Sequence, residues 1–184
     1  FIVGETGTVV ISTGSSYRHG RELIAQAERT GGKPVVLAIV TQPLQEFVMG
    51  AAAFTERGIP MLAQQQTASM ITARCEGCLK NLLQVLGEET MRGTRVLTPT
   101  QIVTDTETRD VAGRTLQLWH PPWAATPGDL LVLDQRSGVA FAGALVSVRR
   151  IPDLRDGKVE GWRRALDAMA ALPIRRLVPG YGPV

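Results

Sequence analysis

Two cysteines form the shortest motif in the sequence whose residue types could do chemistry by themselves. They stand three positions apart, in Cys75-Glu76-Gly77-Cys78. A Cys-x-x-Cys pair can cycle between dithiol and disulfide, supply half of a zinc site, or form a local disulfide. A complete zinc site would need a second such pair, and the sequence has none. Cysteines three apart on a helix share one face, so packing alone would explain the pair. Three alternatives therefore remain: packed free thiols, a disulfide, and a redox or metal role.

The number of histidines limits metal chemistry further. The chain has two, His19 and His120. His19 stands at the beginning of an expected helix, which is typical of a solvent-facing or capping residue. His120 ends an expected strand before two prolines, and we interpret it as structural, with a residual role at a site as the alternative. The sequence therefore offers few of the imidazole ligands that zinc sites commonly use.

The elements that must position these residues alternate between strands and helices. Apolar side chains recur at spacings of three and four in residues 18–29, 67–86 and 159–172, which predicts helices. Residues 35–40 are an apolar, mostly β-branched run, which predicts a strand buried on both faces. Further strands are expected at residues 1–3, 8–11, 61–63, 109–111, 114–119, 130–133, 139–142 and 176–178. This order predicts layers of helix against a mixed sheet.

Length and composition favour one globular domain over residues 1–184. Hydrophobic residues make up 44% of the chain and charged residues 20%, a normal globular balance. No apolar run approaches the roughly 20 residues that span a bilayer. The net charge is +3, but the basic residues are scattered and aromatic residues make up only 5%. We therefore expect neither a nucleic-acid partner nor a membrane span.

Five loop segments follow expected strands, at residues 9–14, 40–47, 125–129, 141–144 and 178–182. The turns among them include Thr13-Gly14, Thr126-Pro127-Gly128 and Pro179-Gly180. In order and spacing, the segments resemble the Asp-Thr-Gly, Thr-His-x-His-x-Asp-His, His-Thr-Pro-Gly, Phe-x-Gly-Asp and Pro-Gly-His-Gly motifs of the metallo-β-lactamase superfamily. A narrower resemblance is to the quinoprotein-relay-system zinc metallohydrolases.

The resemblance implies an α+β fold, an αββα sandwich in which two sheets pack face to face with helices outside. The zinc ligands of this superfamily lie on loops at one edge. Phe1 begins in an expected strand and Val184 ends in a loop, so we expect some terminal elements of the fold to lie outside residues 1–184. The narrower resemblance implies an exported, periplasmic protein found beside bacterial dehydrogenases, and a Cys75–Cys78 disulfide would suit that location.

The positions at which the superfamily holds its zinc ligands have other residue types in this chain. These seven ligand positions are Gln42, Leu44, Glu46, Phe47, Ala125, Ala144 and Tyr181. The Leu, Phe and Ala side chains cannot ligate a metal, Gln42 is a feeble neutral ligand, and Tyr181 would have to ionise from a pKa near ~10. Glu46 alone keeps a good oxygen donor. We therefore predict that the two-zinc site is absent, that no cofactor is bound, and that no metal lowers the pKa of an attacking water towards ~7.

Apolar or small residues at these positions predict a drier, partly filled pocket. Sequence drift after the loss of metal would explain these residues. The alternative is a pocket remodelled for an apolar or aromatic ligand, which Gln42, Glu46 and Tyr181 would orient. The preferred hypothesis is a metal-free binding or accessory protein for a small molecule or for a redox or dehydrogenase partner. The second is a divergent hydrolase with Glu46 as general base and Tyr181 as acid. The third is a thiol redox protein using Cys75 and Cys78.

Overall fold

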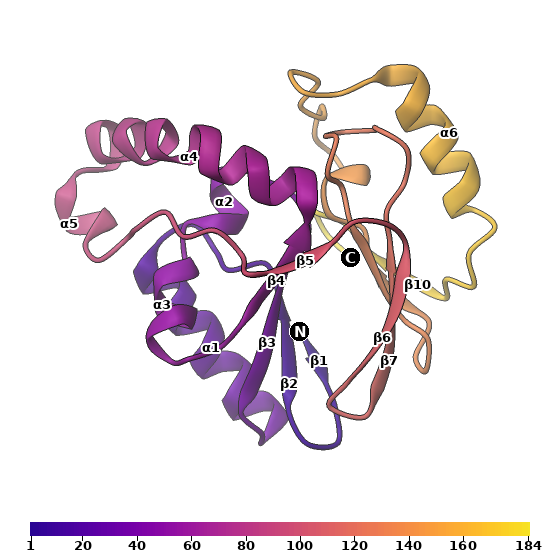
Figure 1. Cartoon of the computed structure of the whole chain (residues 1–184), viewed down its shortest axis with the longest axis horizontal. Coiled ribbons are helices and arrows are strands. Elements are labelled where there is room, and N and C mark those ends of the chain that lie inside the picture. Colours follow the sequence, from indigo (N-terminus) through magenta and orange to yellow (C-terminus); the bar gives the residue numbers. More distant parts are fainter.

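Two five-stranded sheets form the centre of the molecule in the computed structural model, which describes residues 1–184 (Figure 1). The strands of the first sheet follow the chain in the order β1 (Ile2–Val3), β2 (Thr8–Ile11), β3 (Val35–Val40), β4 (Met61–Gln64) and β5 (Gln101–Val103). β1 is antiparallel to β2, and the other neighbours in this sheet are parallel. Parallel neighbours require crossover connections, and helices supply them here.

The second sheet is mostly antiparallel. Its order is β10 (Arg176–Val178), β9 (Val139–Phe141), β8 (Leu131–Asp134), β7 (Arg114–Trp119) and β6 (Glu107–Val111). Tight turns join β6 to β7 and β8 to β9, whereas β10 returns from a helix and lies parallel to β9. The two sheets therefore differ in how they are built: the first by crossovers, the second by hairpins.

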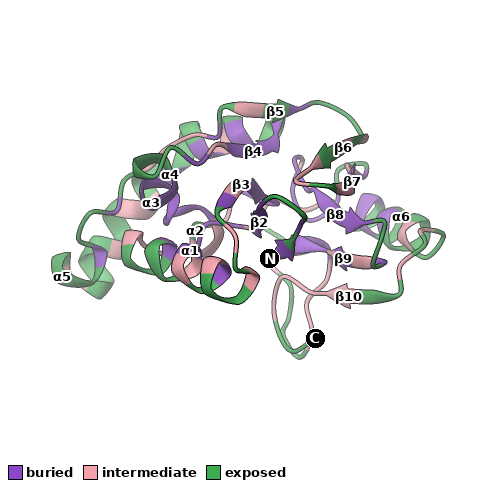
Figure 2. Cartoon of the chain, turned by 90° about the horizontal axis from the view of Figure 1, so that it is seen from below, coloured by how far each residue is buried: buried purple, intermediate pink, exposed green.

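Helices cover the outer faces of both sheets. α1 (Tyr17–Gly31) and α3 (Ala51–Glu56) pack against the first sheet, and α6 (Val159–Met169) packs against the second (Figures 1 and 2). α1 is capped at its N-terminus by Ser16, whose hydroxyl accepts a hydrogen bond from the backbone N–H of His19, and at its C-terminus by Gly32 in the left-handed region. Two short helices, α2 (Gln45–Val48) and α5 (Glu88–Met91), flank the long helix α4 (Gln65–Leu86), and a single 3-10 turn covers Gly143–Leu145.

Three apolar clusters account for the layering. The cluster between the sheets joins residues of the first sheet, such as Leu37, Ile39 and Leu62, to Leu116 and Val132 of the second. Successive residues of a strand point to opposite faces, so each sheet also contributes to an outer cluster beneath its helices. The interior is therefore a helix–sheet–sheet–helix stack.

The αββα sandwich predicted from the sequence is confirmed by this arrangement. Most predicted strands and helices form within two residues of the expected bounds, and α4 runs without interruption through Gly77. The sequence did not predict β5 or α5, which are only three and four residues long. No helix combines the length and apolar character needed to cross a membrane.

Candidate functional site

Backbone hydrogen bonds gather the five loop segments at one edge of the sandwich. The N–H of Thr13 donates to the carbonyl of Phe47 (2.8 Å), and the N–H of Leu130 donates to the carbonyl of Thr41 (3.0 Å). The N–H of Gly180 donates to the carbonyl of Val146 (3.0 Å). Main-chain atoms therefore join the loops after β2 and β3 to the loop before β8, and separately join the loop after β9 to the loop after β10. The side chains at the ligand positions are presented by these loops.

Four ligand positions meet around one small cavity. Leu44, Ala125, Ala144 and Tyr181 line a space of about 20 Å³, which we call the small cavity. A volume of this size holds about one water molecule. The other residues of its wall are Thr126, Ser147, Asp153, Asp156 and Trp162. The loops thus converge, but their side chains leave little free volume at the meeting point.

Tyr181 is held in place on three sides. Its hydroxyl donates a hydrogen bond to Glu46 Oε1 at 2.7 Å, across 135 positions of sequence. Its ring meets the Phe47 ring edge-on, with centroids 5.3 Å apart, and the Arg150 guanidinium lies 4.0 Å from its centroid. Burial and the Glu46 hydrogen bond raise the pKa of the Tyr181 hydroxyl. The ring therefore carries a neutral hydroxyl at ordinary pH and acts as a hydrogen-bond donor.

Gln42 is completely buried beneath the loops. Its Oε1 accepts a long hydrogen bond from Thr41 Oγ1 (3.4 Å), whereas its Nε2 has no hydrogen-bond partner. Gly143 leaves the space in which this amide lies, since a Cβ there would come within 2.6 Å of Gln42 Oε1. An amide oriented in this way offers a free donor, which a cation cannot use.

The remaining ligand positions do not line the small cavity. Glu46, with Leu44 and Tyr181, borders an open groove of about 640 Å³ that runs along α4. Phe47, whose ring touches Tyr181, lines a separate cavity of about 200 Å³ beside Gly143. The structure therefore brings four of the seven residues to one point and distributes Gln42, Glu46 and Phe47 around it.

The sequence motifs did not identify several residues of this region. Ser147, Asp153 and Asp156 close the small cavity from the segment between the 3-10 turn and α6, and Trp162 closes it from α6. The Trp162 indole N–H donates to the carbonyl of Leu145 at 2.9 Å, and Arg74 of α4 forms an ion pair with Asp156 at 2.6 Å. The segment has no helical or strand-like pattern of apolar residues. Only its closeness to Ala144 in the sequence could have indicated that it borders the small cavity.

A buried carboxylate stabilises the turn next to Ala125. Asp129 accepts hydrogen bonds from the backbone N–H and the hydroxyl of Thr126, both at 2.8 Å. Burial raises the pKa of Asp129 to about 6, and the hydrogen bonds from Thr126 partly oppose that rise. The His120 ring lies on the outer side of this turn, with Nδ1 2.9 Å from the carbonyl oxygen of Asp129.

The two cysteines lie one turn apart on α4 as free thiols. Cys75 is buried in an apolar cluster with Val40, Met49 and Ile71. Burial raises the pKa of its thiol to about 12, so it is a poor source of thiolate. Cys78 is half-buried and borders the groove along α4. His19 is distant from these residues and bonds to Ser15 at the beginning of α1, as expected for a capping residue.

Comparisons with known proteins identify the class to which this geometry belongs. The sequence profile of the metallo-beta-lactamase superfamily matches residues 50–181, and the chain therefore belongs to this superfamily. No curated protein matches the sequence significantly.

Solved structures agree with the profile. The chain superimposes on a metallo-beta-lactamase from Pontibacter korlensis with a TM-score of 0.79 and 18% identity, covering 99% of this chain and 78% of that one. For the metallo-beta-lactamase IND-7 the TM-score is 0.75, with 18% identity over 99% and 77% of the two chains. An enzyme from Erythrobacter litoralis, solved with beta mercaptoethanol in the active site, gives 0.72, with 19% identity over 99% and 76%. At these identities the likeness establishes the fold alone.

Zinc is the metal that membership of this superfamily implies, and the residues present do not fit it. Zinc takes imidazole nitrogen, thiolate sulfur or carboxylate oxygen, usually four ligands in a tetrahedron. Around the small cavity, Leu44, Ala125 and Ala144 offer no such atom, and the Tyr181 hydroxyl donates its proton to Glu46. The two carboxylates of the cavity wall, Asp153 and Asp156, are already paired with Arg155 and Arg74. Nowhere in the structure do three or more His, Cys, Asp or Glu side chains gather closely enough to hold a metal ion.

Proposed function

We propose that this chain acts as a binding or accessory protein on a metallo-β-lactamase scaffold and does not hydrolyse substrates by the zinc route. The observation that carries the proposal is the small cavity, where four ligand positions from four loops meet around about 20 Å³. A bound zinc ion and its water would need donor atoms at that point, and three of the four side chains are aliphatic. The partner class that fits the narrower resemblance is a redox protein or dehydrogenase.

Metal analysis tests this proposal. The protein is purified without chelator, and its zinc content is measured by elemental mass spectrometry before and after dialysis against zinc. We expect less than about 0.1 equivalents in both samples, because the carboxylates of the cavity wall are paired with arginines and no group of three ligands lies there. Stoichiometric zinc in either sample would contradict the proposal.

A second candidate function is favoured by the hydrogen bond between Glu46 and Tyr181. The pair borders a groove of about 640 Å³, a volume typical of small-molecule sites. Because the raised pKa keeps the proton on Tyr181, that hydroxyl could protonate a leaving group while Glu46 accepts a proton from water. In the structure the Tyr181 hydroxyl is hydrogen-bonded to Glu46. A substrate would have to break this hydrogen bond before Glu46 could act as a base.

The test of this second candidate uses the ester, thioester, lactam and phosphodiester substrates of the superfamily. If the wild-type chain turns over any of them, we expect Glu46→Gln to lower kcat by at least about 100-fold, the usual loss for a general base. Glu76→Gln, on an exposed part of α4 outside the groove, is the matched control. An equal rate in the Glu46 and Glu76 variants would remove Glu46 from the mechanism.

A further inference from the structure

The positive charge of the chain is concentrated in its last part. Residues 146–184 contain eight of the twenty Lys and Arg residues but only four of the seventeen Asp and Glu residues. Those four carboxylates are already paired: Asp153 with Arg155, Asp156 with Arg74, Glu160 with Arg163 and Arg164, and Asp167 with Arg163. Arg149 makes no ion pair, and Arg150 faces the Tyr181 ring. Residues 146–169 therefore have three cations without an ion-pair partner, Arg149, Arg150 and Lys158, and every carboxylate side chain there is paired.

An apolar groove lies within the same segment. It runs between residues 145–154 and α6, has a volume of about 510 Å³, and is called here the α6 groove. Its walls are largely aliphatic, with Leu145 and Leu154 on one side and Val159 and Leu166 on the other. Val159 is 68% exposed, and Ile151, at the tip of the adjoining loop, is 89% exposed. Exposed aliphatic side chains gathered along a groove mark an interaction surface more often than isolated ones do.

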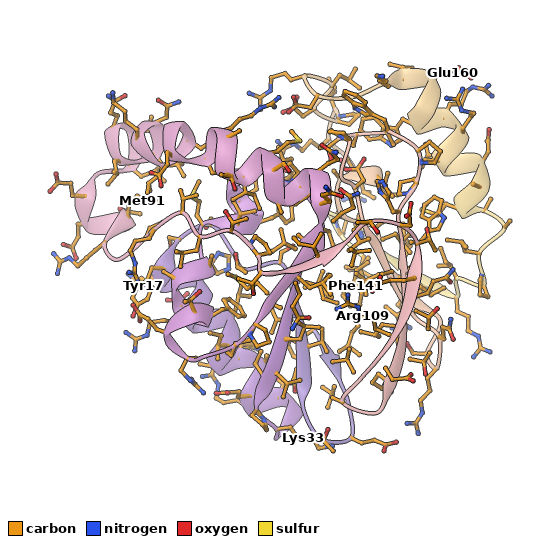
Figure 3. All side chains as sticks on the ribbon, in the orientation of Figure 1. Tyr17, Lys33, Met91, Arg109, Phe141 and Glu160 are labelled. Atoms are coloured by element: carbon orange, nitrogen blue, oxygen red, sulfur yellow. The ribbon has the colours of Figure 1, made fainter.

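The other face of α6 packs against the core. Trp162 and Ala165 are buried against the second sheet, so the helix cannot turn its apolar face outward. Figure 3 shows Glu160 directed away from the body of the protein at the outer end of α6. The α6 groove is thus a fixed hollow between two walls.

A fixed hollow fits a protruding ridge better than it fits a flat lipid surface. The exposed apolar residues of the groove walls are aliphatic, and the nearby exposed Trp123 is engaged by Lys158 and by the carbonyl of Asp156, whereas membrane-interface sites are enriched in free exposed Trp and Tyr. An amphipathic helix presents such a ridge, with apolar anchors at spacings of three and four. The cations without an ion-pair partner in the two walls, Arg149 and Lys158, select acidic residues beside those anchors.

We propose that the α6 groove is a docking site for an acidic amphipathic helix of a partner protein. The aliphatic side chains of that helix fill the groove between Leu154 and Val159, and its Asp and Glu residues lie against Arg149 and Lys158, which make no ion pair. The groove shares only Ser147 and Trp162 with the small cavity. Docking there is therefore independent of whether the small cavity binds metal.

Fluorescence anisotropy on the whole chain tests the proposal with defined peptides. The probe is a labelled peptide of about 18 residues with Leu along one helical face and Glu elsewhere, long enough for five turns. One control peptide replaces every Glu with Lys, and another keeps the composition but scrambles the Leu positions. We expect saturable binding of the acidic amphipathic peptide only, weakened at about 0.5 M salt because exposed charges are screened.

Variants locate the binding. Val159→Glu places a carboxylate in the first turn of α6, where the fold tolerates it, and should weaken binding by about tenfold or more. Val85→Glu is the matched control: Val85 is 79% exposed at the far end of α4 and should leave binding unchanged. Arg149→Asn keeps a residue suited to the positive φ of 57° and should weaken binding about threefold, with Lys80→Asn as its control.

Three results would overturn the docking proposal. The first is no binding of the acidic peptide, or equal binding of the basic one. The second is equal weakening by Val159→Glu and Val85→Glu. The third is that the protein binds no peptide but binds vesicles of phosphatidylcholine and phosphatidylserine, and that Val159→Glu abolishes this vesicle binding. That result would assign the surface to membranes.

Discussion

Two neighbouring parts of one loop show how differently scaffold and site are specified. In the turn at residues 126–129, Thr126 and Asp129 are buried and bonded to each other, and the Thr67 hydroxyl donates to the carbonyl of Gly128. Ala125, one residue earlier, contributes only a methyl group to the small cavity. The turn is determined by its own hydrogen bonds, whereas position 125 needs a particular side chain only if a metal is present. A fold of this kind can therefore persist when its ligand positions change.

The largest expected effect comes from adding one methyl group to the turn. A Cβ on Gly128 would lie 2.3 Å from the backbone nitrogen of Thr67, which cannot move without disturbing α4. We expect Gly128→Ala to lower the free energy of unfolding by about 3 kcal/mol, measured by urea denaturation. Gly77→Ala is the matched control, because Gly77 lies on the exposed side of α4 with no atom within 4 Å. That substitution should raise the free energy of unfolding by roughly 1 kcal/mol. A neutral Gly128→Ala would mean that the turn is looser than its contacts indicate.

The pH dependence of the turn gives a smaller effect of known sign. The pKa of Asp129 is raised from 3.8 to about 6 on folding, so the folded state holds this proton more tightly than the unfolded state. The stabilisation from the protonated carboxyl is complete below about pH 4 and is lost as the pH rises through about 6. The difference in free energy of unfolding between wild type and Asp129→Asn should therefore fall by roughly 2–3 kcal/mol between pH 4 and pH 7. A difference that stays constant with pH would show that Asp129 does not change its charge in this range.

The smallest effect is expected at Tyr181, within the changed part of the site. Tyr181→Phe removes the hydrogen bond to Glu46 but keeps the ring contacts with Phe47 and Arg150. We expect a loss of about 1 kcal/mol in the free energy of unfolding, the usual contribution of one hydrogen bond. Tyr181→Ala, which also removes this half-buried ring, should lose about 2 kcal/mol. Equal losses in the two variants would mean that the ring does not fill the site.

Much of the scaffold could be predicted from the sequence because its signals are local. The β-branched run that became β3 has the bounds its pattern indicates, and the turn residues around Gly128 and Gly180 located the loops. β5 was missed because Gln101–Val103 is three residues long, with one of its two apolar side chains, Ile102, exposed. Its strand character comes from pairing with β4, which no local pattern reveals.

The candidate site was less predictable for a physical reason. The sequence indicated which residues occupy the ligand positions, but the free volume between them depends on packing by Trp162 and Asp156, which no motif marked. The hydrogen bond between Glu46 and Tyr181 likewise depends on the distance between two loops far apart in sequence. Glu46 and Phe47 are adjacent in the chain, yet they border different cavities.

Zinc titration of two proteins tests the central claim most directly: wild type and a variant with ligands restored at the small cavity. The variant carries Leu44→His, Ala125→His, Ala144→Asp and Tyr181→His, four donors from four loops that already meet at one point. We expect calorimetry to show about one zinc bound to the folded variant and less than about 0.1 bound to wild type, since four convergent ligands suffice for a tetrahedral site. Stoichiometric binding by wild type, or no binding by a folded variant, would contradict the claim that side chains alone separate this cavity from a zinc site.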